Sequence, residues 1–267
     1  MAQNPFSASA EPDNRGLAPG NDGGFVPSRV AAERTSDPFL HIAHAAFRDL
    51  VTREDYPCVG ARAALNSGSY ALATYDELGS AAATTTLAAD LWEFTRSEIR
   101  QASEYATFVA VFRQPRENDE KDFERLLWQQ LAKLNRLDAS HFNYDPEVSS
   151  DPGDPQFSFS FAGQSLYVIG MHPRSSREAR RFAYPMLVFN PHEQFERLRA
   201  EGKWKRMQQT IRERDLQLQG SINPMLSDFG QVTEARQYSG RAVEEDWRAP
   251  FEPAKSVAAG KCPFGHG

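Results

Sequence analysis

Two short apolar runs near residue 170 constrain the fold of this 267-residue chain more than any other feature. They cover 167–171 and 186–190, and each is bounded by turn-forming residues, which is typical of a buried strand. His172 follows the first run directly, and His192 follows the second run after Pro191. The pattern predicts two strands that each deliver a histidine to their end.

A cationic cluster lies between these two runs. Ser175 and Ser176 are placed to cap a short helix, whose free N–H groups would add to an anion site. Guanidinium groups bind carboxylates and phosphates with the same planar fork. The cluster therefore predicts an anion site or, in the alternative interpretation, a solvated helix face. Its members are Arg174, Arg177, Arg180 and Arg181.

Histidines at strand ends beside arginines suit an anionic cofactor that needs an axial nitrogen ligand, and haem is such a cofactor. The alternatives are that His172 is a core histidine with both nitrogens satisfied and that His192 is a first-turn helix residue. Cys58 is a further candidate, either as a thiolate iron ligand or as a small buried apolar residue. Asp228 and Glu234, in a long irregular segment, could clamp a cationic substrate or cap loops.

Composition bounds the class of protein. The chain is 40% hydrophobic and 25% charged, which is ordinary for a globular protein. Its net charge of −6 argues against a nucleic-acid partner. It has no apolar run long enough to span a membrane and no secretory signal, so we expect a cytoplasmic protein without a membrane partner. A structural disulfide between Cys58 and Cys262 is not expected there.

Periodicity predicts a single α+β domain over 37–251, with a mainly antiparallel sheet surrounded by helices. Residues 1–36 and 252–267 are rich in small and polar residues, and we expect disordered tails there. Asp37 is the expected N-cap of the first helix, which carries Phe39 to Leu50 on one face. Further helices are expected over 61–66, 81–99, 119–137, 192–201 and 204–217. Strands are expected over 70–75, 107–112, 157–161, 164–171 and 186–190.

Five sequence motifs in order resemble the YqcI/YcgG family, also called FPC/CPF motif-containing proteins. They are YPC at 56–58, GMHPRSSR at 170–177, FNPHEQF at 189–195, INPML at 222–226 and QYSG at 237–240. The resemblance runs from about residue 39 to 251. The chain departs from the family pattern at Tyr56, where the motif has phenylalanine, and at Ala249, where the second motif has cysteine. A separate Cys-Pro-Phe occurs at Cys262.

The resemblance implies a haem-dependent N-hydroxylase, because family members in the guanitoxin and D-cycloserine pathways hydroxylate guanidine groups. It implies a b-type haem, O₂, an external electron donor and hydroxylation of a guanidino nitrogen of arginine or a related compound. Our order of iron-ligand candidates is His172, His192 and Cys58. The arginine cluster, with His172 and His192, would hold the cofactor, and Asp228 and Glu234 would bind the substrate.

Two other functions stay open at this point. A non-enzymatic haem carrier or sensor shares the iron ligand but needs no substrate carboxylate. A phosphate- or nucleotide-handling enzyme would use the arginine cluster, although the chain lacks a phosphate-binding loop. Whether the chain forms a homodimer is also open.

Overall fold

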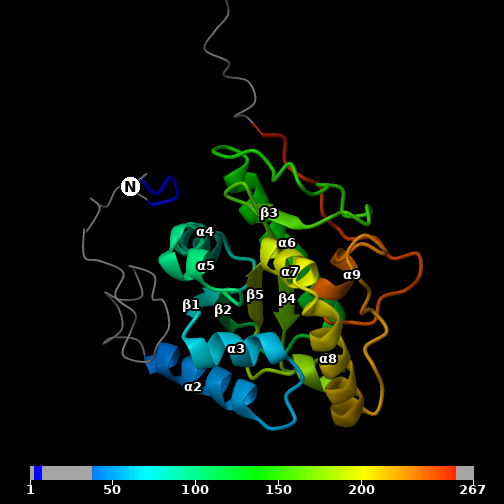
Figure 1. Cartoon of the computed structure of the whole chain (residues 1–267). Helices are drawn as coiled ribbons and strands as arrows, with labels where there is room; N and C mark the ends of the chain where they lie inside the picture. Colours follow the sequence, from blue (N-terminus) through cyan, green and yellow to red (C-terminus); the bar gives the residue numbers. More distant parts are fainter. Residues whose placement is uncertain (1–2, 8–37, 257–267) are drawn as a thin grey trace, which may run out of the picture.

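A computed structural model of the chain describes residues 3–7 and 38–256 (Figure 1). The expected N-cap Asp37 and the C-terminal Cys262 lie outside these residues. Over the described ranges, none of the helices has the length and apolar character needed to cross a membrane.

The centre of the domain is a five-stranded sheet in the order β1-β2-β5-β4-β3. The strands are β1 (Tyr70–Glu77), β2 (Thr107–Gln114), β3 (Phe159–Phe161), β4 (Gln164–Met171) and β5 (Met186–Pro191). β1 pairs with β2 in parallel, whereas β2–β5, β5–β4 and β4–β3 are antiparallel. The predicted α+β class and mainly antiparallel sheet are confirmed.

The hairpin between β3 and β4 forms where the sequence predicts it. Ala162 and Gly163 have φ angles of 54° and 73°, as a two-residue hairpin turn requires. The predicted half-exposed strand is instead fully buried, and Ser158 and Ser160 have no exposed surface. The reason is a covering segment from outside the sheet: Tyr144 donates to the Ser158 carbonyl, and the Asp145 amide donates to the Ser160 hydroxyl.

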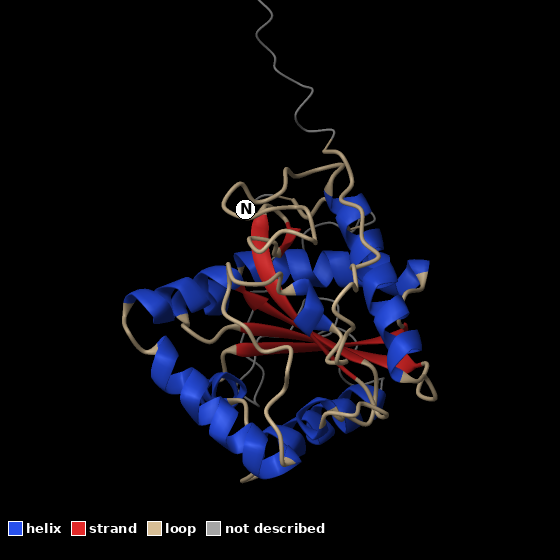
Figure 2. Cartoon of the chain, turned by 90° about the vertical axis from the view of Figure 1, so that its right-hand side faces the viewer, coloured by secondary structure: helices blue, strands red, loops and turns tan. Residues whose placement is uncertain are grey.

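Helices cover both faces of the sheet (Figure 2). They are α2 (Pro38–Thr52), α3 (Val59–Ser67), α4 (Ala81–Arg96), α5 (Glu98–Ala102), α6 (Glu120–Asp138), α7 (His192–Ala200), α8 (Trp204–Gln219) and the single turn α9 (Ala235–Tyr238). The helix expected over 81–99 is divided at Ser97. The Ser97 hydroxyl donates to the Phe94 carbonyl and accepts from the Arg100 amide, so it ends α4 and begins α5.

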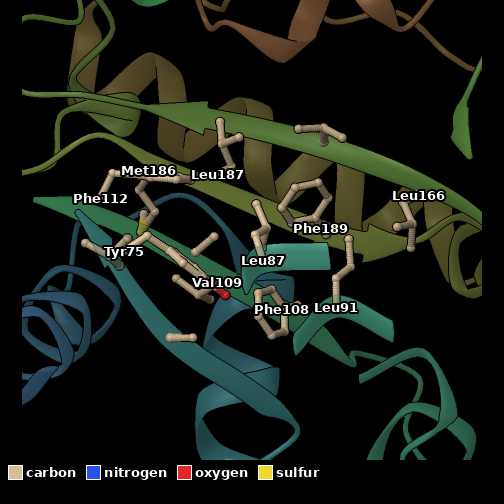
Figure 3. Packing of buried hydrophobic residues seen from close by; sticks show 14 of the residues in the cluster. Tyr75, Leu87, Leu91, Phe108, Val109, Phe112, Leu166, Met186, Leu187 and Phe189 are labelled. Atoms are coloured by element: carbon tan, nitrogen blue, oxygen red, sulfur yellow. The ribbon is translucent and has the colours of Figure 1, made fainter. Parts of the chain in front are cut away.

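Strand alternation divides the side chains between the two faces. On the first face, Leu87 and Leu91 of α4 pack near Phe108 and Phe189 (Figure 3). Gly170 of β4 belongs to the same face. A Cβ atom at Gly170 would lie 2.6 Å from Leu127 Cδ1 and 2.8 Å from Phe123 Cε1, so the glycine lets α6 pack closely on the strand.

Parts of both terminal segments pack on the domain. Phe6 is buried, and its ring lies 5.2 Å from that of Phe161. The Ala254 amide donates to Asn135 Oδ1 at 2.7 Å. At these residues the structure differs from the disorder expected for 1–36 and 252–267, because each segment supplies groups that α6 and β3 would otherwise leave uncovered.

Candidate functional site

A cavity of about 250 Å³ lies on the second face of the sheet. Its floor is formed by alternate residues of β4 and β5, and its walls come from α3, α7, α8 and the irregular segment after α8. The apolar floor residues are Ile169, Met171, Met186 and Val188. The cavity therefore brings the strand pair identified in the sequence together with the YPC motif and the irregular segment.

α8 forms the outer wall of the cavity and buries little of its own surface. Asp215 is its only buried residue, while Trp204, Met207 and Ile211 line the cavity and stay half-buried. Asp215 Oδ2 accepts from Arg177 at 2.6 Å and from the Asn223 amide at 2.8 Å. The apolar side of this amphipathic helix faces the cavity and is only partly buried. A ligand in the cavity would bury that side.

Cys58 lies at the start of α3 and lines the cavity. Its Sγ accepts a hydrogen bond from the Ala61 amide at 3.4 Å, in the place where a serine or threonine oxygen usually caps a helix. Burial raises the pKa of the Cys58 thiol. The Ala61 amide and the helix N-terminus favour a negative sulfur, but burial in apolar surroundings opposes it more strongly. A bound metal ion would therefore be needed to hold Cys58 in the thiolate form.

Glu234 is a buried acid of the cavity and, unlike Asp215, is not paired with an arginine in the described structure. It is 3% exposed, and Tyr238 donates its hydroxyl to Glu234 Oε1 at 2.5 Å. Burial raises the pKa of Glu234 to about 8, so the carboxyl is mostly protonated at neutral pH. A guanidinium entering the cavity would favour the ionised form and gain a bidentate partner.

His192 opens α7, as the first-turn interpretation states, and it also lines the cavity. Its Nε2 lies 3.3 Å from Glu196 Oε1, and its Nδ1 lies 3.7 Å from Glu234 Oε2. Within the described ranges, Nδ1 has no hydrogen-bond partner. Burial lowers the pKa of His192, so the ring is neutral and one nitrogen lone pair is available.

His172 does not reach the cavity. It is 2% exposed, and its ring stacks on Phe123 of α6 at 4.4 Å with an interplanar angle of 18°. Alternation explains this position, because His172 continues the Leu166, Val168, Gly170 side of β4. The structure therefore brings His192 and Cys58 together at one cavity and leaves His172, our first candidate, on the opposite face. His172 is thus a core residue, but among the described residues its Nδ1 has no hydrogen-bond partner, so the expectation that both nitrogens of a core histidine are satisfied is wrong here.

The arginine cluster is dispersed. Arg177 and Arg180 line the cavity, but Arg177 is paired with Asp215, and Arg180 donates to the carbonyls of Gly170 and Gln237. Arg174 pairs with Glu117, and Arg181 lies 3.6 Å from Glu178, both away from the cavity.

The short helix expected beside this cluster is a single 3₁₀ turn, Glu178–Arg180. The Ser176 amide and hydroxyl both donate to Glu120 Oε1 at 2.8 Å. A carboxylate of the chain itself thus takes the place expected for an external anion. With the cluster dispersed in this way, the phosphate-enzyme interpretation loses the feature on which it depended.

Arg199 and Arg212 are cavity cations that sequence reasoning missed, and Arg199 is paired with Glu196. Arg212 lies in α8, and across 3–7 and 38–256 its guanidinium has no hydrogen bond or ion pair. The signal was available, because Trp204, Met207, Ile211 and Arg212 recur at helical spacing. Arg212 gives the cavity a guanidinium that is free to bind a carboxylate.

Asp228 does not line the cavity. Its Oδ1 accepts from Trp204 Nε1 at 3.3 Å and from Gln208 Nε2 at 2.5 Å. It therefore fixes the first turns of α8 to the segment that follows the helix. Of the two predicted acids, only Glu234 is in the cavity. The described residues contain no group of three or more histidine, cysteine or acidic side chains that could hold a metal ion.

The raised pKa of Glu234 predicts how stability depends on pH. The folded chain keeps a proton up to about pH 8, whereas the unfolded chain releases it near 4.5. The free energy of unfolding should therefore fall as pH rises from about 4.5 to about 8, by about 1.4 kcal/mol for each pH unit. Urea titrations of wild type and Glu234→Gln across this range check it. The expected result is a smaller fall in the variant, and parallel pH profiles would contradict it.

Comparison with known proteins gives one family. A sequence model of the YqcI/YcgG family matches residues 47–252. The chain is 28% identical over 172 residues to a protein of Bacillus subtilis (strain 168) described as "Uncharacterized protein YqcI". That match covers 62% of this chain and 63% of the B. subtilis protein, which is less than two thirds of its length. No solved structure matches the chain.

Proposed function

The chain belongs to the YqcI/YcgG family, and we propose that it is a haem-dependent oxygenase that hydroxylates a guanidino nitrogen of arginine or a related guanidine compound. The observation that carries the proposal is that Cys58 and Glu234 line the same cavity. The first is a thiol at a helix N-terminus that can ligate a metal as the thiolate, and the second is a buried acid suited to a guanidinium. A haem carrier or sensor would need only the first.

The donor set fits a b-type haem. The iron needs a single strong ligand from the protein, and a cysteine thiolate can serve. The Ala61 amide, 3.4 Å from Cys58 Sγ, would stabilise the charge on that thiolate. The apolar floor suits a macrocycle, and the unpaired Arg212 suits a propionate or a substrate carboxylate. We therefore propose Cys58, in place of His172, as the iron ligand.

The small size of the cavity predicts that α8 moves when a cofactor binds. Sites for drug-sized ligands have volumes of about 300–1,000 Å³, and the cavity is slightly smaller than that. A macrocycle would need more room, so we expect α8 to move outward when the cofactor binds. The helix is suited to this, because Asp215 is its one buried residue. Its half-buried Met207 and Ile211 would then pack on the ligand.

When bound, the haem would supply the activation of O₂. The chain's own residues would bind and orient the substrate. Glu234 would hold two nitrogens of the guanidinium and so select which nitrogen faces the reaction. His192 Nδ1 lies 3.7 Å from Glu234 Oε2 without a hydrogen bond, and the neutral ring would not compete with the guanidinium for that carboxylate as a cation would. The Phe229 ring, 4.4 Å from the His192 ring, would exclude water.

The test is an absorption spectrum followed by turnover. The full-length chain is expressed with a haem precursor and titrated with haemin, and arginine and smaller guanidines are then supplied with O₂ and a reductant. We expect one haem per chain and a product heavier than the substrate by one oxygen atom. Absence of a Soret band with stoichiometric haemin would overturn the proposal. Haem binding without product from any guanidine would favour the carrier or sensor.

A further inference from the structure

A continuous row of tyrosine and tryptophan rings leads away from the cavity. Tyr167 lines the cavity, and its ring lies 5.8 Å from that of Tyr238. Tyr238 stacks on Trp128 at 5.5 Å with an interplanar angle of 20°. Trp128 lies 6.1 Å from Trp247. These distances are those of ring contact, and the residues come from β4, α9, α6 and the segment after α9.

The row runs from the interior to solvent. Tyr238 and Trp128 have no exposed surface, while Trp247 is half-buried and reaches the outside. Arg236 fixes the segment that carries Trp247, because its guanidinium donates to the carbonyls of Glu244 and Trp247. The outer end of the row is thus held in place against Trp128.

Phenol and indole are the side chains that most readily give up one electron reversibly, and phenylalanine does not. The core around the row is rich in phenylalanine, with Phe157 and Phe251 contacting Tyr238 and Trp128 from the side. The hydroxyls of Tyr167 and Tyr238 are hydrogen-bonded, to Gln237 Oε1 and Glu234 Oε1, and so both phenols have polar partners. In the described part of the chain, Trp128 Nε1 has no hydrogen-bond partner, so hydrogen bonding does not explain why this residue is tryptophan.

We propose that Tyr167, Tyr238, Trp128 and Trp247 form a path that carries single oxidising equivalents between the cavity and the surface. Trp128 contacts both Tyr238 and Trp247, so it is the bridge between them in the proposed path. The path is a property of the chain, and its use to remove unspent oxidising equivalents from a haem in the cavity rests on the proposed oxygenase function.

Each step along the path conserves electrons and protons. An oxidant in the cavity takes one electron from Tyr238, directly or through Tyr167. The Tyr238 phenol proton passes along its hydrogen bond to the Glu234 carboxylate, which is ionised above a pH of about 8. Trp128 returns an electron to Tyr238, which regains its proton, and Trp247 returns one to Trp128. Trp128, with no proton acceptor, stays protonated and passes the electron without proton loss. A thiol or ascorbate in solution finally reduces Trp247.

The path can be tested in the reverse direction without haem. Azidyl radicals, generated by pulse radiolysis, oxidise the solvent-accessible tryptophans of the full-length chain. The solution is held near pH 9, above the pKa of about 8 that burial gives Glu234, so that Tyr238 has a proton acceptor. We expect indolyl radical absorption to decay as tyrosyl absorption grows, with a first-order rate independent of protein concentration.

The variants locate the path. Trp128→Phe and Trp247→Phe should lose the first-order phase, and Tyr238→Phe, which removes only a hydroxyl, should leave the indolyl radical without that tyrosyl product. Trp204→Phe is the matched control, because this half-buried tryptophan of α8 has no ring contact with the row, and it should keep the phase. A wild-type rate in both Trp128→Phe and Tyr238→Phe would overturn the path.

A second measurement separates the path from its use. The haem-loaded chain is treated with hydrogen peroxide without substrate, at the same pH as the radiolysis, and oxidation of Trp247 is measured by peptide mass spectrometry. We expect Trp247 to be oxidised in wild type and spared in Trp128→Phe. Equal oxidation in both would overturn the role toward the cofactor. If the chain binds no haem, the oxygenase proposal fails, and the radiolysis still decides whether the path exists.

Discussion

Cys58→Ser is expected to abolish the thiolate spectrum of the haem-loaded chain and, with it, hydroxylation. Serine is among the best helix N-caps, so its hydroxyl should accept from the Ala61 amide as Cys58 Sγ does and keep α3 intact. A serine hydroxyl is a much weaker iron ligand than a cysteine thiolate. The hydroxyl stays protonated and is a hard donor, whereas the thiolate is negatively charged and is a soft donor. Ferrous–CO absorption spectra of wild type and variant check the ligand, and product formation checks activity.

His172→Gln is the matched control for Cys58→Ser. His172 is the stronger candidate from sequence alone, but its ring stacks on Phe123 on the other side of the sheet. We expect this variant to lose some stability and to keep both the spectrum and the activity. The opposite pattern, in which Cys58→Ser keeps the wild-type spectrum while His172→Gln loses it, would return the iron ligand to His172. Loss of the spectrum in His192→Gln alone would assign the ligand to His192.

Glu234→Gln is expected to lose guanidine hydroxylation while the haem spectrum stays unchanged. Removing one partner of a desolvated, hydrogen-bonded charge pair costs about 2–5 kcal/mol, which corresponds to roughly 30-fold to several thousand-fold in kcat/KM. The glutamine amide can still accept from Tyr238, so the buried network around it keeps its packing. Steady-state kinetics with arginine, at fixed haem content, measure the loss.

Asp228→Asn is the control for the carboxylate, because both acids come from the same irregular segment. Asp228 binds Trp204 and Gln208 and does not line the cavity. An asparagine can still accept from both, so we expect kcat/KM close to that of wild type. Comparable losses in the two variants would show that the segment acts on activity through its fold, and the assignment of Glu234 to the substrate would then be wrong.

The strands, the helices and several of their ends are readable from the sequence because they depend on neighbours along the chain. Asp119 caps α6 by accepting from the Asp122 amide, and the turn at Ala162 and Gly163 closes the hairpin, as local turn and capping chemistry predicts. The division at Ser97 was missed, because a serine within an apolar period is compatible with either one helix or two.

The membership of the site depends on contacts between residues far apart in sequence. His172 and His192 look equivalent along the chain, since each ends an apolar strand. Alternation assigns them to faces, but the sequence does not say which helices cover which face. Only the packing of α6 on Gly170 and of α8 over β4 and β5 separates a core histidine from one that lines a cavity.

The ion-pair partners of the arginines also could not be predicted from the sequence. Their clustering along the sequence predicted one anion site, yet the fold gives Arg177 to Asp215, Arg174 to Glu117 and leaves Arg212 unpaired in the described structure. The sequence by itself determined the elements, their order and the supply of a thiol, an acid and cations. Tertiary structure alone decided which of these share a cavity, because ion pairs form between whichever charges the packing of the helices brings within reach.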